Sequence, residues 1–222
     1  MRVLNFGSLN IDYVYQVDHF VQPGETMSAL SLAVNCGGKG LNQSVALARA
    51  GAETWHAGLI GAEGRFLKET LEQAGVHTDF VEEIAGSTGH AIIQVDRTGQ
   101  NSILLHDGAN GQIAPEFIGR VLERFGAGDT VLVQNETSCV GEIIRMAVSR
   151  GMKAALNAAP ANEKLSALPL ELLHWLLVNE VALEGASLEE ALTLAAAASA
   201  LAVTRPGAAA SVPAYEEVLA AL

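Results

Sequence analysis

A glycine cluster that leads into a helix is the part of the sequence best suited to hold a polar ligand. Residues 35–43 read Asn-Cys-Gly-Gly-Lys-Gly-Leu-Asn-Gln, and a helix is predicted over about 41–50. Closely spaced glycines let the backbone approach a ligand where a Cβ would clash, and a helix start leaves N–H groups without intrahelical partners. Lys39 adds a positive charge, and Asn42 adds an amide that donates and accepts hydrogen bonds. A tight strand-to-helix turn without a ligand has the same pattern.

Polar residues also follow several short apolar runs. Asn10 and Asp12 come after the run 3–6, and two residues apart in an extended segment they point to the same side. Glu136 follows the run 131–133, and later runs end at Asn157 and Asn179. Because the carboxyl ends of parallel strands meet at one edge of a sheet, these side chains predict a polar cleft there. For Asn10 and Asp12, a turn stabilised by their own side chains is the alternative.

The elements that must position these residues alternate between strand and helix. The patterning predicts strands at 3–6, 55–60, 131–133, 154–156 and 176–178, and helices at 41–50, 66–73, 115–125 and 139–150. Such alternation indicates an α/β fold with a parallel sheet covered on both faces. The alanine-rich stretch 191–203 predicts a further, buried helix.

Two segments do not follow this alternation. Residues 13–34 and 90–105 have β-type patterns with turns at 23–26 and 97–100. We expect them to form a small separate sheet, a lid over the cleft, with strands inserted at about 12–35 and 89–106 into a single domain of residues 1–222.

Composition excludes several classes of function. The 222 residues are half hydrophobic and carry a formal net charge of −12, which repels phosphate backbones and argues against nucleic-acid binding. Two cysteines, Cys36 and Cys139, are too few for a disulfide framework and favour a reducing cytoplasm. No apolar stretch reaches the roughly 20 residues of a membrane span, so we expect no membrane association.

A set of short motifs carries a specific resemblance. The motifs are Gly-Ser-Leu-Asn-Ile-Asp at 7–12, Pro-Gly-Glu-Thr at 23–26, Gly-Gly-Lys-Gly-Leu-Asn-Gln at 37–43, Thr-Gly-His-Ala at 88–91, Gly-Ala-Asn at 108–110, Asn-Ala-Ala-Pro-Ala at 157–161, Asn-Glu at 179–180 and Val-Thr-Arg-Pro-Gly-Ala at 203–208. In this order they resemble the ribokinase (pfkB-type) family of ATP-dependent carbohydrate kinases, over nearly the whole chain. Each motif alone is weak, and the ordered set is specific.

The resemblance implies a doubly wound α/β/α sandwich with a small β lid, which often forms a homodimer interface, and phosphoryl transfer from ATP to a sugar hydroxymethyl group. It assigns sugar binding to Asn10, Asp12, Gly38, Lys39, Asn42 and Glu136. Asn179 matches a residue near the nucleotide phosphates, and Ala202, Arg205, Gly207 and Ser211 match positions that bind a monovalent cation. The resemblance implies ATP and Mg²⁺ as cofactors, with K⁺ as a further candidate.

One motif of the family is present in an unsuitable place. The catalytic base of the family is an Asp in a late Gly-Ala-Gly-Asp motif that opens a helix. The same letters occur at 126–129, but they close the helix 115–125 and precede the strand 131–133, so no helix N-terminus faces a phosphate there. We therefore predict that Asp129 is not a catalytic base.

The segment that should follow Asn179 is missing. Residues 180–185 run directly into 186–192, which resemble the family's late helix, so two or three βαβ units, roughly 60 to 90 residues, are absent. The family's Asn-x-x-Glu pattern, linked to magnesium, would place Glu at Ala182, whereas Glu184 is two positions later.

The central sheet is therefore expected to be incomplete, with impaired catalysis. The chain is then a sugar kinase described by a shortened sequence, a non-catalytic sugar-binding or dimerising remnant, or a misassembled fragment with an open sheet edge. The identity of the sugar stays open.

Overall fold

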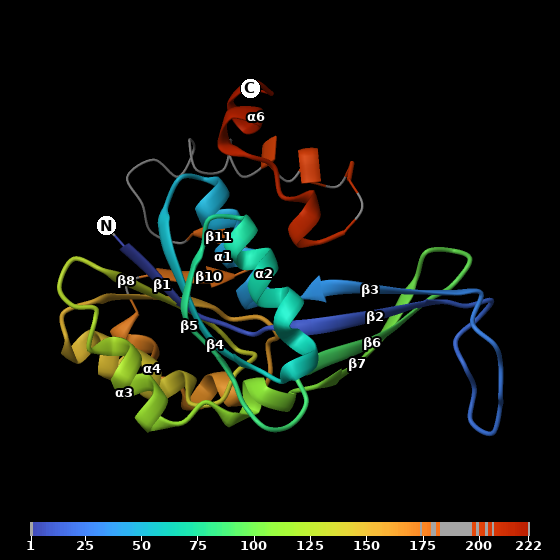
Figure 1. Cartoon of the computed structure of the whole chain (residues 1–222), viewed down its shortest axis with the longest axis horizontal. Helices are drawn as coiled ribbons and strands as arrows, with labels where there is room; N and C mark the ends of the chain where they lie inside the picture. The colour runs from blue at the N-terminus through green and yellow to red at the C-terminus, as the bar shows by residue number, and fades with distance from the viewer. Residues whose placement is uncertain are drawn as a thin grey trace.

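A seven-stranded sheet forms the centre of the described part of the molecule (Figure 1). The computed structural model describes residues 2–173, 175–178, 181–182, 197–198, 200–202, 204–205 and 207–221. The strands, in the order in which they lie across the sheet, are β11 (Val181–Ala182), β10 (Trp175–Val178), β9 (Lys153–Asn157), β8 (Thr130–Gln134), β1 (Arg2–Phe6), β4 (Glu53–Ile60) and β5 (His77–Glu83). Neighbouring strands are parallel except for β10 and β11.

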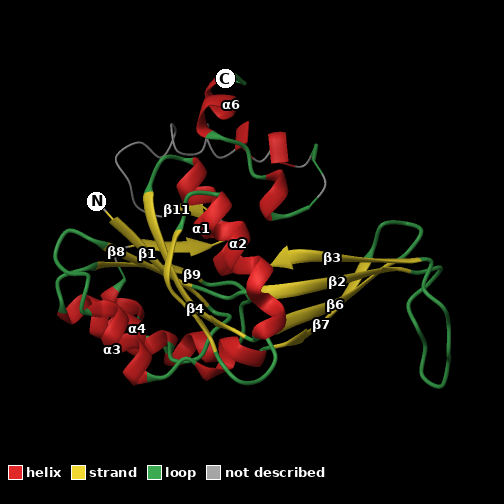
Figure 2. Cartoon of the chain, viewed as in Figure 1, coloured by secondary structure: helices red, strands yellow, loops and turns green. Residues whose placement is uncertain are grey.

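Helices cover both faces of this sheet, as Figure 2 shows. Helices α1 (Lys39–Arg49) and α2 (Arg65–Gln73) lie on one face, and α3 (Pro115–Leu122) and α4 (Val140–Ser149) on the other. The chain also contains α6 (Tyr215–Leu219) and short 3₁₀ helices at Ala62–Gly64, Gly108–Gln112, Glu163–Ala167, Leu170–Leu172 and Ala209–Ser211.

Strand β1 shows why the layers form. Its side chains alternate between the two faces, so Leu4 and Phe6 enter the core cluster under α3 and α4. Val3 points to the α1 face, where it packs near Leu47. Phe6 meets Phe117 of α3 edge to face, with ring centroids 6.2 Å apart. Because β1 is buried on both faces, it carries apolar residues on both, as is typical of a central parallel strand, and only Asn5 interrupts the run 3–6.

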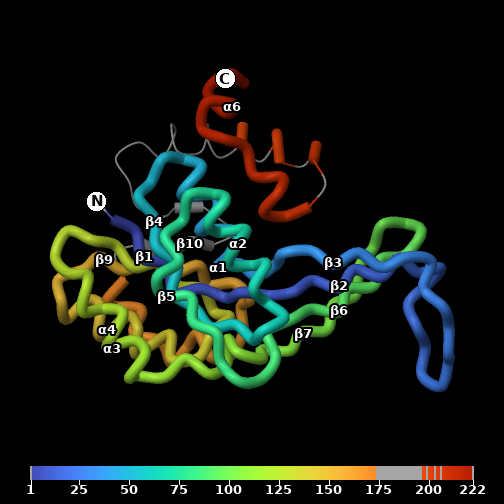
Figure 3. The backbone as a smooth tube through the Cα atoms, viewed as in Figure 1, coloured from blue at the N-terminus to red at the C-terminus, as the bar shows by residue number. Residues whose placement is uncertain are grey.

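Four strands form a second sheet, which projects from the core in Figure 3. They are β3 (Ser31–Gly37), β2 (Asn10–Gln16), β6 (Gly89–Val95) and β7 (Asn101–His106), in this spatial order, and we call them the lid sheet. Strands β2 and β6 are parallel, and the two outer pairs are antiparallel. The predicted doubly wound α/β fold with a separate small sheet is confirmed.

Some local predictions were wrong. Strand β5 was not expected, because only Thr78 and Val81 are buried and its charged residues break the apolar pattern. Helix α3 ends at Leu122, short of the predicted 125. The predicted helix 191–203 lies mostly outside the described residues. Among the residues the structure describes, no helix is long and apolar enough to cross a membrane.

Candidate functional site

The glycines of the cluster allow two backbone segments to touch. The loop after β1 crosses the start of α1, where a Cβ on Gly40 would lie 2.3 Å from the nitrogen of Ser8 and 2.4 Å from Cα of Gly7. Gly38, which precedes α1, has φ +95°, and a Cβ there would lie 2.7 Å from the carbonyl oxygen of Ser8. The glycines are therefore needed for the contact between α1 and the β1 loop.

Glu136 occupies the N-terminus of α1. Its Oε2 accepts a hydrogen bond from the backbone N–H of Lys39 at 2.9 Å, and its Oε1 lies 2.7 Å from Lys39 Nζ. Ser8 Oγ donates to the same Oε2 at 2.5 Å. A carboxylate at a helix start is favoured by the helix dipole. Glu136 therefore balances the positive charge that Lys39 brings to the start of α1.

Asp12 lies close to this ion pair. It belongs to β2 of the lid sheet, on the same face as Asn10. Burial raises the pKa of Asp12 to about 6, the charge of Glu136 adds to the rise, and the Lys39 ammonium opposes it. The structure therefore brings together two carboxylates and one ammonium at the edge of the sheet where β1 and β8 end.

Asn10 is fixed by a neighbouring amide. Asn110, in the 3₁₀ helix after β7, donates from Nδ2 to Oδ1 of Asn10 at 2.7 Å. Its own Oδ1 accepts the backbone N–H of Leu9 at 3.0 Å. Asn110 and Ser8 belong to motifs that carry the family resemblance, but no role was predicted for either residue. Their motifs, 108–110 and 7–12, were the available signals.

Asn42 offers an unused acceptor. It lies in the first turns of α1, and its Oδ1 is buried without a hydrogen-bond partner among the described residues. A buried amide oxygen without a partner costs free energy, so a hydroxyl donor from a ligand would be stabilising there.

A polar cavity of about 400 Å³ extends from Glu136 and Asn10 beneath the lid sheet. It is lined by Asn10, Leu105, His106, Asp107, Asn110, Gly111, Asn135, Glu136, Thr137, Ser138, Pro160, Asn162 and Lys164. The hydroxyl oxygen of Thr137 is buried and has no partner within the described part of the chain. The site thus combines charged groups at α1 with a ring of amides and hydroxyls, as orientation of a polyol requires.

A buried polar network underlies the site. Asn5 donates from Nδ2 to Ser44 Oγ at 2.8 Å and to the carbonyl oxygen of Gly40 at 2.8 Å. Ser44 Oγ lies 2.8 Å from His56 Nδ1, and His56 Nε2 lies 3.2 Å from the oxygen of Gly7. Complete burial lowers the pKa of His56 to about 4, so the ring is neutral and donates from Nε2. His56 therefore has a structural role, because it fixes the β1 loop against α1.

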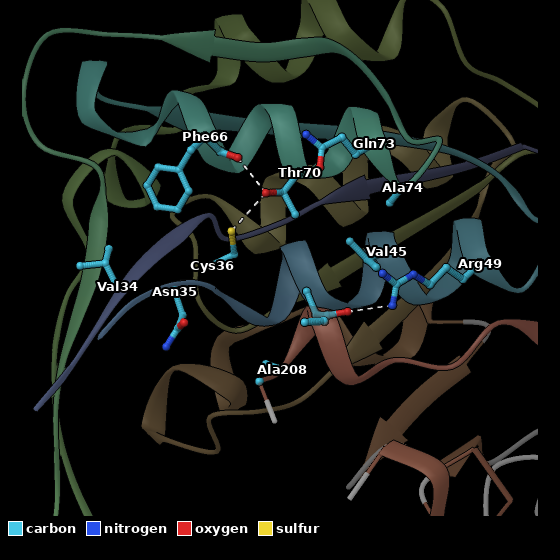
Figure 4. A pocket seen from close by; sticks show the side chains of 13 residues that line it. Val34, Asn35, Cys36, Val45, Arg49, Phe66, Thr70, Gln73, Ala74 and Ala208 are labelled. Atoms are coloured by element: carbon cyan, nitrogen blue, oxygen red, sulfur yellow. Dashed lines mark hydrogen bonds between the residues drawn. The ribbon is translucent and has the colours of Figure 1, made fainter. Parts of the chain in front are cut away.

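A second cavity, of about 660 Å³, lies between β3, α1, α2 and residues 207–210 (Figure 4). Cys36 Sγ and Thr70 Oγ1 approach to 3.2 Å there. Arg49 donates to the carbonyl oxygen of Ala209 at 2.9 Å and also contacts that of Val212. None of the expected sugar-binding residues lines this cavity.

The residues that the resemblance relates to a monovalent cation have protein partners. Ser211 Oγ donates to Ala208 O at 2.8 Å, and the carbonyl oxygen of Ala202 accepts the N–H of Arg205 at 3.1 Å. The guanidinium of Arg205 pairs with Glu217 at 2.6 Å. The Ser211 hydroxyl, the Ala202 carbonyl oxygen and the Arg205 guanidinium thus each have a partner within the described part of the chain, while Gly207 has a positive φ of +90°. Within the described ranges no group of three or more His, Cys, Asp or Glu residues is suited to a metal ion.

Asp129 lies before β8, at the amino edge of the sheet and thus opposite the site. It accepts hydrogen bonds from Arg2 Nε at 3.0 Å and Nη2 at 2.5 Å. Asn179 lies outside the described residues.

Comparisons with known proteins identify the family of this chain. The family model of the pfkB family carbohydrate kinases matches residues 2–184. The ribokinase of Haemophilus influenzae is 35% identical over 183 residues, 80% of this chain and 60% of that protein. The ribokinase of Staphylococcus aureus is 35% identical over 178 residues, 78% of this chain and 57% of that protein. The chain thus spans less than two thirds of these relatives.

Solved structures of ribokinases have a similar fold. The ribokinase of Cryptococcus neoformans in complex with ADP is 26% identical, with a TM-score of 0.81 over 100% of this chain and 99% of that one. The ribokinase of Thermotoga maritima aligns with the same identity, TM-score and coverage. Since the family model covers most of the sequence, the chain belongs to the pfkB family of carbohydrate kinases.

Proposed function

We propose that this chain contains the sugar-binding half of a ribokinase-like kinase, which transfers a phosphoryl group from ATP to the hydroxymethyl group of a sugar. The observation that carries the proposal is the convergence of Asp12, Lys39 and Glu136 at one sheet edge. Asn42 and Asn10 add amides to the same region. Charged and amide groups that converge in this way bind and orient a polyol.

The chemistry assigned to each group follows from its surroundings. Asp12, when ionised, accepts hydrogen bonds from sugar hydroxyls, and Lys39 donates to a sugar oxygen. Gly38 lets the sugar approach the helix start, while Glu136 orients Lys39 through their ion pair. These groups bind and position the acceptor hydroxyl. A base that removes its proton is not among them.

ATP is the expected phosphoryl donor, which is supported by the ADP bound to the Cryptococcus neoformans ribokinase. Asn179 would lie near its phosphates. Mg²⁺ would enter with the nucleotide, because this ion is usually bound through substrate phosphates and one or two carboxylates. K⁺ is the further cofactor that the family resemblance implies, at Ala202, Arg205, Gly207 and Ser211.

We further propose that an internal segment with the catalytic base is absent, so that turnover is impaired. The sequence matches cover 60% of the Haemophilus influenzae protein, whereas the structural alignment reaches 99% of the Cryptococcus neoformans chain. This contrast supports a gap inside the chain. A non-catalytic sugar-binding or dimerising remnant is the second candidate, supported by an intact lid sheet with exposed apolar residues such as Leu32 and Leu104. We place either protein in the cytoplasm, as a homodimer formed through the lid sheet.

Calorimetric titration with D-ribose, 2-deoxyribose and D-fructose, with and without ATP and Mg²⁺, tests the proposal. Sugar binding with no ADP release in a coupled assay supports the sugar-binding half without catalysis. ADP release that depends on sugar would show that the base is present after all. No heat with any of these sugars would contradict the proposed function, provided that circular dichroism shows a folded protein.

A further inference from the structure

Ser8 joins three parts of the site. It lies in the loop after β1, and its side chain is completely buried. Its Oγ accepts the backbone N–H of Gly40 at 3.1 Å and donates to Glu136 Oε2 at 2.5 Å. Its carbonyl oxygen accepts the N–H of Leu41 at 3.0 Å. One short residue therefore holds both the start of α1 and the carboxylate that follows β8.

The direction of the Ser8 hydroxyl is determined by these contacts. A hydroxyl has one proton and two lone pairs, and the Gly40 N–H occupies a lone pair. The proton is left to point at Glu136, and hydrogen bonds to a charged acceptor are the stronger kind. Lys39 Nζ is less suited to fix Glu136, because its side chain is long and 39% exposed.

We propose that Ser8 is a positioning residue that holds the carboxylate of Glu136 on the N-terminus of α1. Three donors, Ser8 Oγ, Lys39 N and Lys39 Nζ, contact this carboxylate. Since a carboxylate has about four acceptor positions, one is left for a ligand hydroxyl. Ser8 thereby sets the direction from which Glu136 and Lys39 meet a sugar. This last step rests on the proposed function.

The first experiment needs no ligand. Amide hydrogen exchange in Ser8→Ala is compared with the wild-type chain, and the decisive signal is the Lys39 amide, which bonds to Glu136 and not to Ser8. If Ser8 holds Glu136, exchange at Lys39 becomes about tenfold faster in Ser8→Ala. The matched control is Thr78→Ala, because Thr78 Oγ1 also donates to a glutamate, Glu72, at 2.7 Å, but in α2 and β5. It should leave the Lys39 exchange rate unchanged.

The second experiment uses D-ribose titration in a double-mutant cycle. Ser8→Ala and Glu136→Gln should each weaken binding about tenfold or more, and the double variant should be no weaker than Glu136→Gln alone. Losses that multiply would show that Ser8 acts independently of Glu136 and would overturn the proposal. Unchanged Lys39 exchange in Ser8→Ala would overturn it too. If the wild-type chain binds no ribose but Lys39 exchange responds to Ser8→Ala, the positioning role holds and only the proposed function fails.

Discussion

The carboxylate of Asp12 lies in the space that a side chain at position 37 would enter. A Cβ on Gly37 would lie 2.2 Å from Oδ1 of Asp12. Because Gly37 has no side chain, the carboxylate of Asp12 packs against β3 and is shielded from bulk water. This enclosure is the main reason why the pKa of Asp12 rises to about 6.

Asp12→Asn is expected to stabilise the sugar-free protein at pH 7. A carboxyl whose folded pKa lies above its unfolded value of 3.8 favours folding most at low pH, and this contribution is lost as pH rises through about 6. Replacing the ionised group should raise the free energy of unfolding by on the order of 1 kcal/mol, after allowing for solvent screening of this partly exposed group. Urea denaturation measures the change. A less stable variant would show that the ionised carboxylate of Asp12 does not destabilise the folded protein.

Sugar affinity is expected to fall in acid. If ionised Asp12 accepts hydroxyl protons from the sugar, its protonation below about pH 6 removes an acceptor. The association constant for ribose, measured by calorimetry between pH 5 and 8, should fall by up to about tenfold per pH unit below the pKa. In Asp12→Asn binding should be weak and this pH dependence absent. A flat profile in the wild-type chain would exclude Asp12 from sugar binding.

His56 is expected to make the fold sensitive to acid. Its pKa is about 4 in the folded protein against 6.5 unfolded, so its contribution is complete above pH 6.5 and is lost as pH falls toward 4. The loss is on the order of 3 kcal/mol. Denaturation at several pH values should show that the free energy of unfolding falls between pH 6.5 and 4, because the unfolded chain binds more protons than the folded one. In His56→Gln the number of protons taken up on unfolding should be lower by about one. An unchanged proton uptake would mean that other groups cause it.

Two helical glycines form a matched pair for testing the close approach. Gly40→Ala would place a Cβ 2.3 Å from the nitrogen of Ser8, and we expect a loss of about 2 to 3 kcal/mol of stability and weaker sugar binding. At Gly119 in α3 the nearest atom is Met146 Cε at 3.9 Å, so Gly119→Ala should be stabilising by up to about 1 kcal/mol. Thermal unfolding measures both. Equal effects would show that the contact of α1 with the β1 loop is not tight.

Asp129→Asn tests the prediction that this residue is no catalytic base. Its hydrogen bonds to Arg2 lower the pKa of Asp129 and tie it to the amino edge of the sheet. The variant should lose only about 1 kcal/mol of stability, because Arg2 is partly exposed and an exposed ion pair is weak. It should keep the wild-type ribose affinity and any ADP release. Loss of ADP release at unchanged ribose affinity would reverse the prediction.

The sequence predicted those strands and helices that are determined by the pattern of apolar and polar residues within one segment. Short apolar runs that alternate with helical segments predicted the central strands, and the β-type segments predicted the lid sheet. Strand β5 was missed because it lies at the sheet edge, where Asp79, Glu82 and Glu83 interrupt the apolar pattern and blunt the edge.

The organisation of the site could be predicted only in part. The polar residues after β1 and β8 were recognised, but their partners depend on tertiary contacts. Nothing in the spacing of Lys39 and Glu136, 97 residues apart, shows that Glu136 contacts the N-terminus of α1. For the same reason the bridging role of Ser8 was not predicted, although its motif was noted.

The central position of β1 also limits when the sheet can form as the chain is synthesised. Arg2 pairs with Glu53 of β4, and Val3 pairs with Thr130 of β8, so the central strand pairs with segments that are far from it in the sequence. Contacts that distant in sequence are slow to form. A nascent chain that has emerged only as far as α2 would expose one side of β1, and chaperone dependence during synthesis should therefore persist until β8 has left the ribosome.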